Sequence, residues 1–189
     1  MNENKVDQSD LSLRKDAGEV WYAVHTRVHR ERIVESRLRT QGLTAFVPFT
    51  TELHTWSDRR KTVEVPVFAS YVFVRAVMND TNRRKMLTVD GVAGLVGNRG
   101  QGTPIPDSEI NAVHALVSRR ICWTPYPFMN VGDRVRIRGG ALNGIEGILL
   151  FDDGDNTLVV SIELLGRSLA VSVAGYHIEV LPPVTRSLN

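Results

Sequence analysis

Apolar residues recur at two different spacings along this chain, and each spacing predicts a different kind of secondary structure. Between Asn130 and Leu181, strand-length apolar runs are separated by glycine and acidic turns, with no helical period. This pattern predicts a small antiparallel β-barrel, and a barrel of this kind mainly serves to bind other molecules.

The residues before the barrel alternate between strand and helix patterns. Gly42 stands where the C-terminal glycine of a helix belongs, and Asp107 or Ser108 can cap another helix at its start. We expect strands at 20–25, 45–48, 67–75 and 92–96, an exposed hairpin at 54–66, and helices at about 30–40, 80–87 and 107–119. This order predicts an α+β layer with a mostly antiparallel sheet, followed by the barrel.

Composition divides the chain further. The two ends are polar, and residues 121–130 before the barrel hold two prolines and no charge, which predicts a semi-rigid linker. The expected parts are a disordered tail at 1–18, a first domain at 19–119, a linker at 120–130, the barrel at 131–182 and a second tail at 183–189.

Charge is unevenly distributed between these parts. Residues 1–120 carry 18 Lys and Arg against 14 Asp and Glu, whereas residues 121–189 carry 5 against 7. Nucleic acid, if bound, is therefore expected at the first domain rather than at the barrel. A single cysteine and the lack of a signal-peptide pattern after Met1 favour a reducing compartment, the cytoplasm.

Residues suited to catalysis do not group into any known arrangement. The five histidines lack metal-ligand spacing, Cys122 has no nearby base in sequence, and no phosphate-binding glycine motif is present. The acidic run at 152–155 lacks the spacing of a calcium loop and is typical of a turn. We therefore expect no enzyme, no metal and no cofactor.

Several short motifs, in a fixed order, resemble one known family. Residues 21–24 (W-Y-A-V), 68–74 (F-A-S-Y-V-F-V), 131–147 and 164–167 (L-L-G-R) are similar to the opening strand, the F-P-G-Y-V-F-V strand, the KOW motif and the F-G-R turn of the NusG family of transcription elongation factors. The resemblance implies a ferredoxin-like NGN domain followed by an SH3-like KOW barrel.

A closer similarity is to specialised paralogues of the UpxY type, which act on polysaccharide operons. The runs R-x-H-x-E from Arg27, W-S-D-R-R-K from Trp56 and V-P-V-F from Val65 resemble that subgroup. Two departures stand out: Ala69-Ser70 replaces the Pro-Gly of the family, and Leu165 replaces the phenylalanine of the F-G-R turn.

The strand at 67–75 carries the aromatic residues. Alternation places Phe68, Ser70, Val72 and Val74 on one face, and Ala69, Tyr71, Phe73 and Arg75 on the other. The two rings of the second face either pack under helices or form an exposed apolar groove for a partner helix. The family resemblance implies the groove, which docks on the clamp helices of RNA polymerase. The residues it implies for polymerase binding are Trp21, Phe68, Tyr71, Phe73, Arg83 and Arg84.

Basic residues cluster at the end of the first strand and on the first helix: His25, Arg27, His29, Arg30, Arg32, Arg37 and Arg39. They form either a solvated helix face or a surface for the non-template DNA strand. Arg27, His29 and Arg30 are the candidates for nucleic-acid binding, since they lie in the loop that faces DNA in relatives. The hairpin-tip run Arg59–Lys61 is expected to be exposed.

On the barrel rim, the resemblance implies a binding site for a second partner, formed by Leu142, Ile145, Leu165 and Arg167. In relatives this partner is a small-subunit ribosomal protein or the termination factor Rho. The branched residues of the last third favour a barrel over the helical hairpin that some relatives adopt.

The family resemblance, taken with these patterns, implies a monomeric elongation and antitermination factor. It binds RNA polymerase through its first domain, suppresses pausing and recruits a second partner through the barrel, on polysaccharide-type operons. Two alternatives are a general NusG that recruits Rho and a ribosome-associated RNA-binding KOW protein. The net acidic barrel disfavours the latter.

Overall fold

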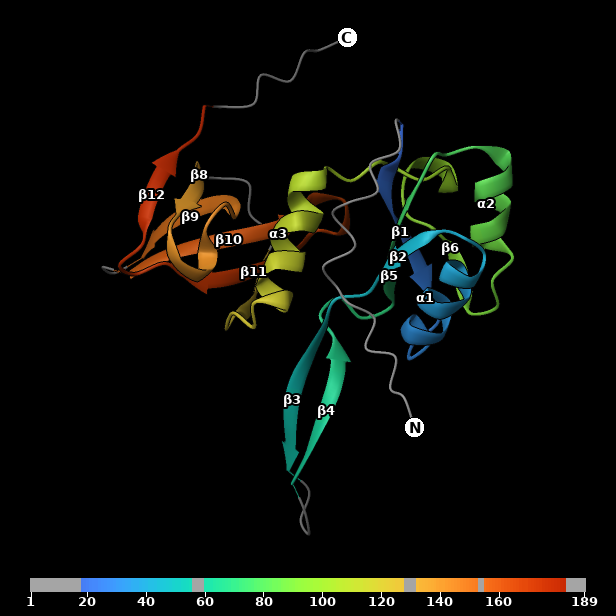
Figure 1. Ribbon diagram of the computed structural model, residues 1–189, viewed down its shortest axis with the longest axis horizontal. Helices are drawn as coiled ribbons and strands as arrows, with labels where there is room; N and C mark the ends of the chain where they lie inside the picture. The colour runs from blue at the N-terminus through green and yellow to red at the C-terminus, as the bar shows by residue number, and fades with distance from the viewer. Residues whose placement is uncertain (1–17, 56–59, 128–131, 153–154, 183–189) are drawn as a thin grey trace. The chain divides into compact units, whose positions relative to one another are not determined.

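The computed structural model describes residues 18–55, 60–127, 132–152 and 155–182 (Figure 1). The chain divides into two compact units, Met1–Pro104 and Ile105–Asn189. Most of the predicted tails, at 1–17 and 183–189, lies outside the described residues, as do the hairpin tip at 56–59 and residues 153–154 of the acidic turn.

The first unit is built on an antiparallel sheet with strand order β2-β5-β1-β6. Its elements are β1 (Val20–Thr26), α1 (Glu31–Thr40), β2 (Thr44–Phe46), β5 (Tyr71–Ala76), α2 (Asp80–Leu87), β6 (Val92–Leu95) and the short 3₁₀ helix η2 (Asn98–Gly100). Helix α1 packs on β2 and β5, and α2 packs on β6. The predicted α+β fold is confirmed.

One face of this sheet forms the core of the first unit. Val72 and Val74 of β5 point to the same side and pack with Val34 and Leu38 of α1 and with Met86 of α2. The spacing of Val34 and Leu38 places both on one face of α1, so that burial of this stripe fixes the helix on the sheet. The side chain of Asn79 accepts a hydrogen bond from the backbone N–H of Asn82 and caps α2.

A two-stranded ribbon, β3 (Phe49–Thr55) and β4 (Arg60–Pro66), extends away from this sheet (Figure 1). It is the predicted hairpin, but it begins at Phe49 rather than at His54. At its base, the Arg32 guanidinium lies 4.2 Å from the centre of the Phe49 ring and 2.7 Å from a Glu64 carboxylate oxygen. These contacts fasten the ribbon to helix α1.

The second unit contains a sheet of strand order β12-β8-β9-β10-β11-β7. Its elements are α3 (Asp107–Ser118), β7 (Thr124–Pro127), β8 (Asp133–Arg138), η3 (Gly140–Leu142), β9 (Glu146–Asp152), β10 (Asp155–Ile162), η4 (Glu163–Leu165), β11 (Arg167–Ser172) and β12 (His177–Val180). All of its strand pairs are antiparallel, as predicted for the barrel.

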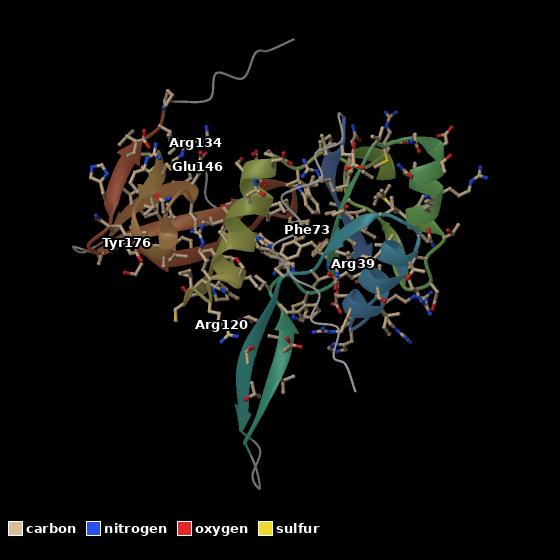
Figure 2. The ribbon with its side chains drawn as sticks, viewed as in Figure 1. Arg39, Phe73, Arg120, Arg134, Glu146 and Tyr176 are labelled. Carbon is tan, nitrogen blue, oxygen red and sulfur yellow. The ribbon has the colours of Figure 1, made fainter. Side chains whose placement is uncertain are left out.

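Charged side chains link three strands of the barrel. The Glu146 carboxylate accepts hydrogen bonds from Arg134, at 2.9 Å, and from Arg136, and the two labelled residues Arg134 and Glu146 lie together in Figure 2. Arg138 pairs with Glu179 at 2.6 Å, and its hydrogen bond lowers the pKa of that carboxyl. Opposite charges on adjacent strands stabilise their pairing.

Two segments expected elsewhere belong to the second unit. Helix α3 packs on β9 and β10, although the sequence places it in a first domain ending at residue 119. Residues 124–127 of the predicted linker form β7 and pair with β11, at an edge of the sheet where prolines are tolerated. The boundaries of independently folding domains stay a prediction.

Candidate functional site

The aromatic residues predicted to bind polymerase gather on β1, β5 and the turn before β5. Phe73 is fully buried, Trp21 and Phe68 are buried, and Tyr71 is half-buried. The Phe73 ring lies 5.9 Å from the Phe68 ring, edge to face, and 6.4 Å from the Phe46 ring. We call Trp21, Phe46, Phe68, Tyr71 and Phe73 the aromatic face. It is packed rather than an open groove, and Tyr71 is its most accessible predicted member.

Phe68 lies on a different face of the sheet from the one that alternation along the predicted strand 67–75 assigns to it. Strand β5 begins at Tyr71, and Ser70 before it has a left-handed φ of 68°, so residues 67–70 turn instead of continuing the strand. This turn brings Phe68 against Phe73. Ser70 adopts the conformation that the glycine of the family motif would adopt at little steric cost.

A buried carboxylate holds this turn against the basic loop at 27–30. Glu31, the first residue of α1, is buried and accepts a hydrogen bond from the Ser70 N–H at 2.7 Å. The Thr26 N–H donates to the Ser70 carbonyl at 2.9 Å, and the Arg27 N–H donates to the Gly91 carbonyl. Tyr71 and the basic loop are thereby fixed beside each other, with the His25 and Tyr71 ring centres 5.5 Å apart.

The candidates for nucleic-acid binding are all on the surface. Arg27, His29 and Arg30 are exposed, and His29 has a left-handed φ of 61°. Asp90, which the sequence analysis did not connect with this cluster, lies 4.0 Å from Arg27 and 3.0 Å from Arg37. The hydrogen bond from Arg37 lowers the pKa of Asp90, so its carboxylate offsets part of the positive charge.

The two polymerase candidates on α2 differ in their surroundings. Arg84 is exposed, whereas Arg83 is half-buried and its guanidinium lies 3.4 Å from the Gly100 carbonyl oxygen. Arg84 is therefore the more available side chain for a partner. The run Arg59–Lys61 cannot be compared in the same way, because Arg59 and the side chains of Arg60 and Lys61 lie outside the described residues.

The barrel candidates are less exposed than a rim site requires. Leu142 and Ile145 are 1% and 2% exposed, Leu165 is half-buried and Arg167 is exposed. The expectation of an open apolar spot at Leu142 and Ile145 is therefore wrong for this state of the second unit. Leu142 and Ile145 instead belong to the buried apolar residues of the second unit.

Helix α3 is fastened to the barrel beside these candidates. The Arg119 guanidinium donates to the carbonyl oxygens of Ala141 and Asn143 at 2.9 and 3.1 Å. At the other end, the Glu109 carboxylate accepts from the Glu163 N–H at 3.1 Å. Burial raises the pKa of Glu109 to about 7. No pattern in the sequence links these distant residues.

The described residues contain neither a metal-binding group nor a membrane-spanning helix. Within 18–55, 60–127, 132–152 and 155–182, no group of three or more His, Cys, Asp and Glu side chains is arranged to hold a metal ion. The same residues contain no helix with the length and apolarity needed to span a bilayer. Cys122 is exposed.

Comparison with known proteins identifies the family to which this chain belongs. A family model described as transcription termination factor nusG matches residues 19–114, just over half of the chain. The chain is 28% identical over 171 residues to the transcription termination/antitermination protein NusG of Lactococcus lactis, covering 84% of this chain and 91% of that protein. The corresponding protein of Borreliella burgdorferi is 26% identical over 179 residues, covering 84% and 97%.

A solved structure shares the fold. The structure titled "Domain interaction in Thermotoga maritima NusG" matches with a TM-score of 0.50 and 22% identity, over 87% of this chain and 98% of that one. The family match ends inside α3, so the sequence of this helix continues the first domain although its packing joins it to the barrel.

Proposed function

The chain belongs to the NusG family of transcription termination and antitermination factors, and from this membership we propose that it binds RNA polymerase and suppresses pausing. The observation that carries the proposal is the fixed position of half-buried Tyr71 beside the exposed loop at 27–30. An aromatic contact and a basic loop on one rigid unit suit a partner that combines protein and nucleic acid. No covalent step, metal or cofactor is involved.

Bridging by the first unit accounts for the effect on pausing. Tyr71 and Phe73 lie on the sheet face opposite the one covered by α1 and α2, while Arg84 is exposed on α2. We infer that the aromatic face contacts the clamp helices and that Arg83 and Arg84 contact the polymerase across the main channel. An open clamp would break one of these contacts, so bridging disfavours opening, and pausing requires that opening.

The barrel is proposed as a recruiting module. Half-buried Leu165 and exposed Arg167 would bind the second partner, a small-subunit ribosomal protein or Rho, whereas Leu142 and Ile145 are buried in this structure. A second weak site on the same chain raises the local concentration of whatever it binds near the polymerase. A monomer in the cytoplasm suffices for this role.

We further propose that the protein is a specialised paralogue of the UpxY type that serves polysaccharide operons. The R-x-H-x-E run from Arg27 and the V-P-V-F run from Val65 support this assignment. A general factor that recruits Rho is the alternative. Deleting the gene separates the two, since loss of viability favours the general factor and loss of one operon's distal transcripts favours the paralogue.

Capture of RNA polymerase tests the central contact. We expect Tyr71→Ala to reduce polymerase bound to the immobilised full chain about tenfold or more, because aromatic residues dominate interface energetics at about 2 kcal/mol each. Tyr176→Ala, which removes a similarly half-buried tyrosine from the second unit, is the matched control and should leave capture unchanged. Equal capture by wild type and Tyr71→Ala would remove the aromatic face from the polymerase contact.

Binding of single-stranded DNA tests the basic loop. With a fluorescent oligonucleotide as probe, we expect Arg27→Ala combined with Arg30→Ala to weaken binding. The slope of log affinity against log salt should also fall by about 0.7 for each phosphate that the variant no longer neutralises. Arg99→Ala removes another exposed arginine and serves as the control. An unchanged slope in the double variant would make the loop a solvated surface only.

A further inference from the structure

The carboxylate of Asp90 lies among arginines of the basic loop and of helix α1. The Arg37 Nη1 atom donates to Asp90 Oδ2 at 3.0 Å and to the Asp90 carbonyl oxygen at 3.0 Å. The Arg27 Nη1 atom lies 4.0 Å from Asp90 Oδ1. The hydrogen bond from Arg37 lowers the pKa of Asp90, and the charges of Arg27 and Arg30 lower this pKa further. We call Arg27, Arg30 and Arg37 the arginine cluster, and Asp90 is the anion that it holds.

Backbone contacts fix the position of this carboxylate in addition to its ion pairs. Gly91, the next residue, has a left-handed φ of 99°, and a Cβ added to it would lie 3.0 Å from Val34 Cγ2 and 3.3 Å from Arg30 Cβ. The turn at 88–91 therefore lies directly against helix α1. The Arg27 N–H donates to the Gly91 carbonyl oxygen at 2.8 Å. These contacts hold Asp90 beside the arginine cluster even when its carboxylate has no partner.

The ion pairs of this cluster are open to solvent. The side chains of Asp90, Arg27 and Arg37 are 69%, 75% and 48% exposed. Exposed ion pairs contribute little to stability, because water and dissolved ions compete with them. A phosphate oxygen accepts the same charge-assisted hydrogen bonds from a guanidinium group as a carboxylate oxygen does. The phosphates of a nucleic acid can therefore take the place of the Asp90 carboxylate without disturbing the fold of the first unit.

We propose that Asp90 is an internal competitor for the phosphate backbone of single-stranded nucleic acid at the arginine cluster. The inference rests on the nucleic-acid binding proposed for the loop at 27–30. It adds Arg37 as a further phosphate contact, and it adds a carboxylate that the strand must displace. Three arginines against one carboxylate leave the cluster two net positive charges instead of three. The free protein then binds nucleic acid weakly, and the cluster is filled only where a strand is held at high local concentration, as beside a bound polymerase.

Binding of a fluorescent single-stranded DNA oligonucleotide to the full chain tests this role. Asp90→Asn keeps the size of the side chain, and Arg37 retains its hydrogen bond to the backbone carbonyl oxygen of residue 90. We expect the variant to bind the oligonucleotide about fivefold more tightly, because no exposed ion pair has to be broken first. The slope of log affinity against log salt should steepen by about 0.7, the value for one more neutralised phosphate. Asp80→Asn, which removes an exposed carboxylate from α2 of the same unit, is the matched control and should bind as wild type does.

A double-variant cycle separates displacement of the carboxylate from general repulsion of the strand. If the carboxylate occupies Arg37, the gain from Asp90→Asn should shrink when Arg37→Ala is already present. The same gain should stay complete when Arg99→Ala, which removes an exposed arginine outside the cluster, is present instead. Equal gains in these two backgrounds would mean that Asp90 acts by its charge alone, and the competitor role would be lost.

The remaining outcomes distinguish this inference from the function on which it rests. Unchanged or weaker DNA binding by Asp90→Asn, or an equal gain in Asp80→Asn, would overturn the competitor role and leave the nucleic-acid surface intact. If the wild type and Asp90→Asn both failed to bind the oligonucleotide at low salt, the nucleic-acid surface itself would be wrong, and the role of Asp90 with it. A gain for an acidic peptide but none for DNA would also overturn the proposal and assign the cluster to an acidic protein partner.

Discussion

Replacing Phe73 with alanine is expected to lower the free energy of unfolding by about 3–5 kcal/mol, the range for truncating a fully buried phenylalanine. Its ring is 0% exposed and packs between the Phe46 and Phe68 rings on a central strand of the first sheet. Collapse of the resulting cavity is restricted, because β5 pairs with β1 on one side and β2 on the other. Urea unfolding followed by circular dichroism measures the loss.

Two variants serve as controls for this loss. Phe73→Leu keeps most of the buried volume and should cost about 1 kcal/mol, and Tyr71→Ala truncates a half-buried ring on the same strand at an intermediate cost. A loss below about 1 kcal/mol for Phe73→Ala would show that the ring is not packed in solution. Because Phe73→Ala weakens the fold, Tyr71→Ala is the sharper probe of polymerase binding.

Local patterns in the sequence are sufficient to predict the helices. The stripe of Ile33, Val34 and Leu38 with Gly42 behind it predicts 30–40, and α1 spans Glu31–Thr40, although Ile33 is exposed and only Val34 and Leu38 of the stripe are buried. Helix α3 begins at Asp107, close to the expected position, but its N-cap is Pro106, so the expectation that Asp107 or Ser108 caps it is wrong. These features depend on residues three or four positions apart, which interact directly within a helix.

The geometry of the candidate site depends on contacts between residues far apart in the sequence, and no local pattern predicts such contacts. Asp90 lies 53 residues from Arg37 along the chain, and Glu64 lies 32 residues from Arg32, so neither partner could be assigned before the fold was known. Strand alternation correctly separated Val72 from Phe73, but it failed at Phe68 because the turn at Ser70 interrupts the strand. Burial of Phe73 likewise follows from neighbours on other elements.

The predicted linker is a second case in which the local sequence did not reveal a contact with a distant element. Two prolines and no charge describe an extended segment, and residues 124–127 are extended. An extended backbone can also pair with the edge of a sheet, and here residues 124–127 pair with β11 and become the edge strand themselves. Proline occupies an edge strand without removing a required ladder hydrogen bond, so the composition of a linker and that of an edge strand overlap.

The barrel glycines appear alike in the sequence, but they serve two different physical purposes. Gly139, Gly140 and Gly144 have left-handed φ angles between 59° and 83°, so conformation favours glycine there. Gly147 has no such angle and lies on β9 opposite Val135. A Cβ at Gly147 would lie 2.4 Å from the Val159 carbonyl oxygen and 3.0 Å from Leu158 Cδ1. Space alone requires glycine at this position.

Gly147→Ala is therefore expected to destabilise the barrel by about 3 kcal/mol or more, at or above the upper end for overpacking, because the blocking atom belongs to the backbone of the paired strand β10. Gly144→Ala, with open space but a φ of 83°, should cost only about 1–2 kcal/mol. Gly94→Ala, with neither restriction, should change stability by less than about 0.5 kcal/mol. Thermal unfolding of the three variants measures this order. If Gly147→Ala were as stable as Gly94→Ala, β9 and β10 could not be as closely packed as the structure places them, and the surface on which α3 rests would have to differ as well.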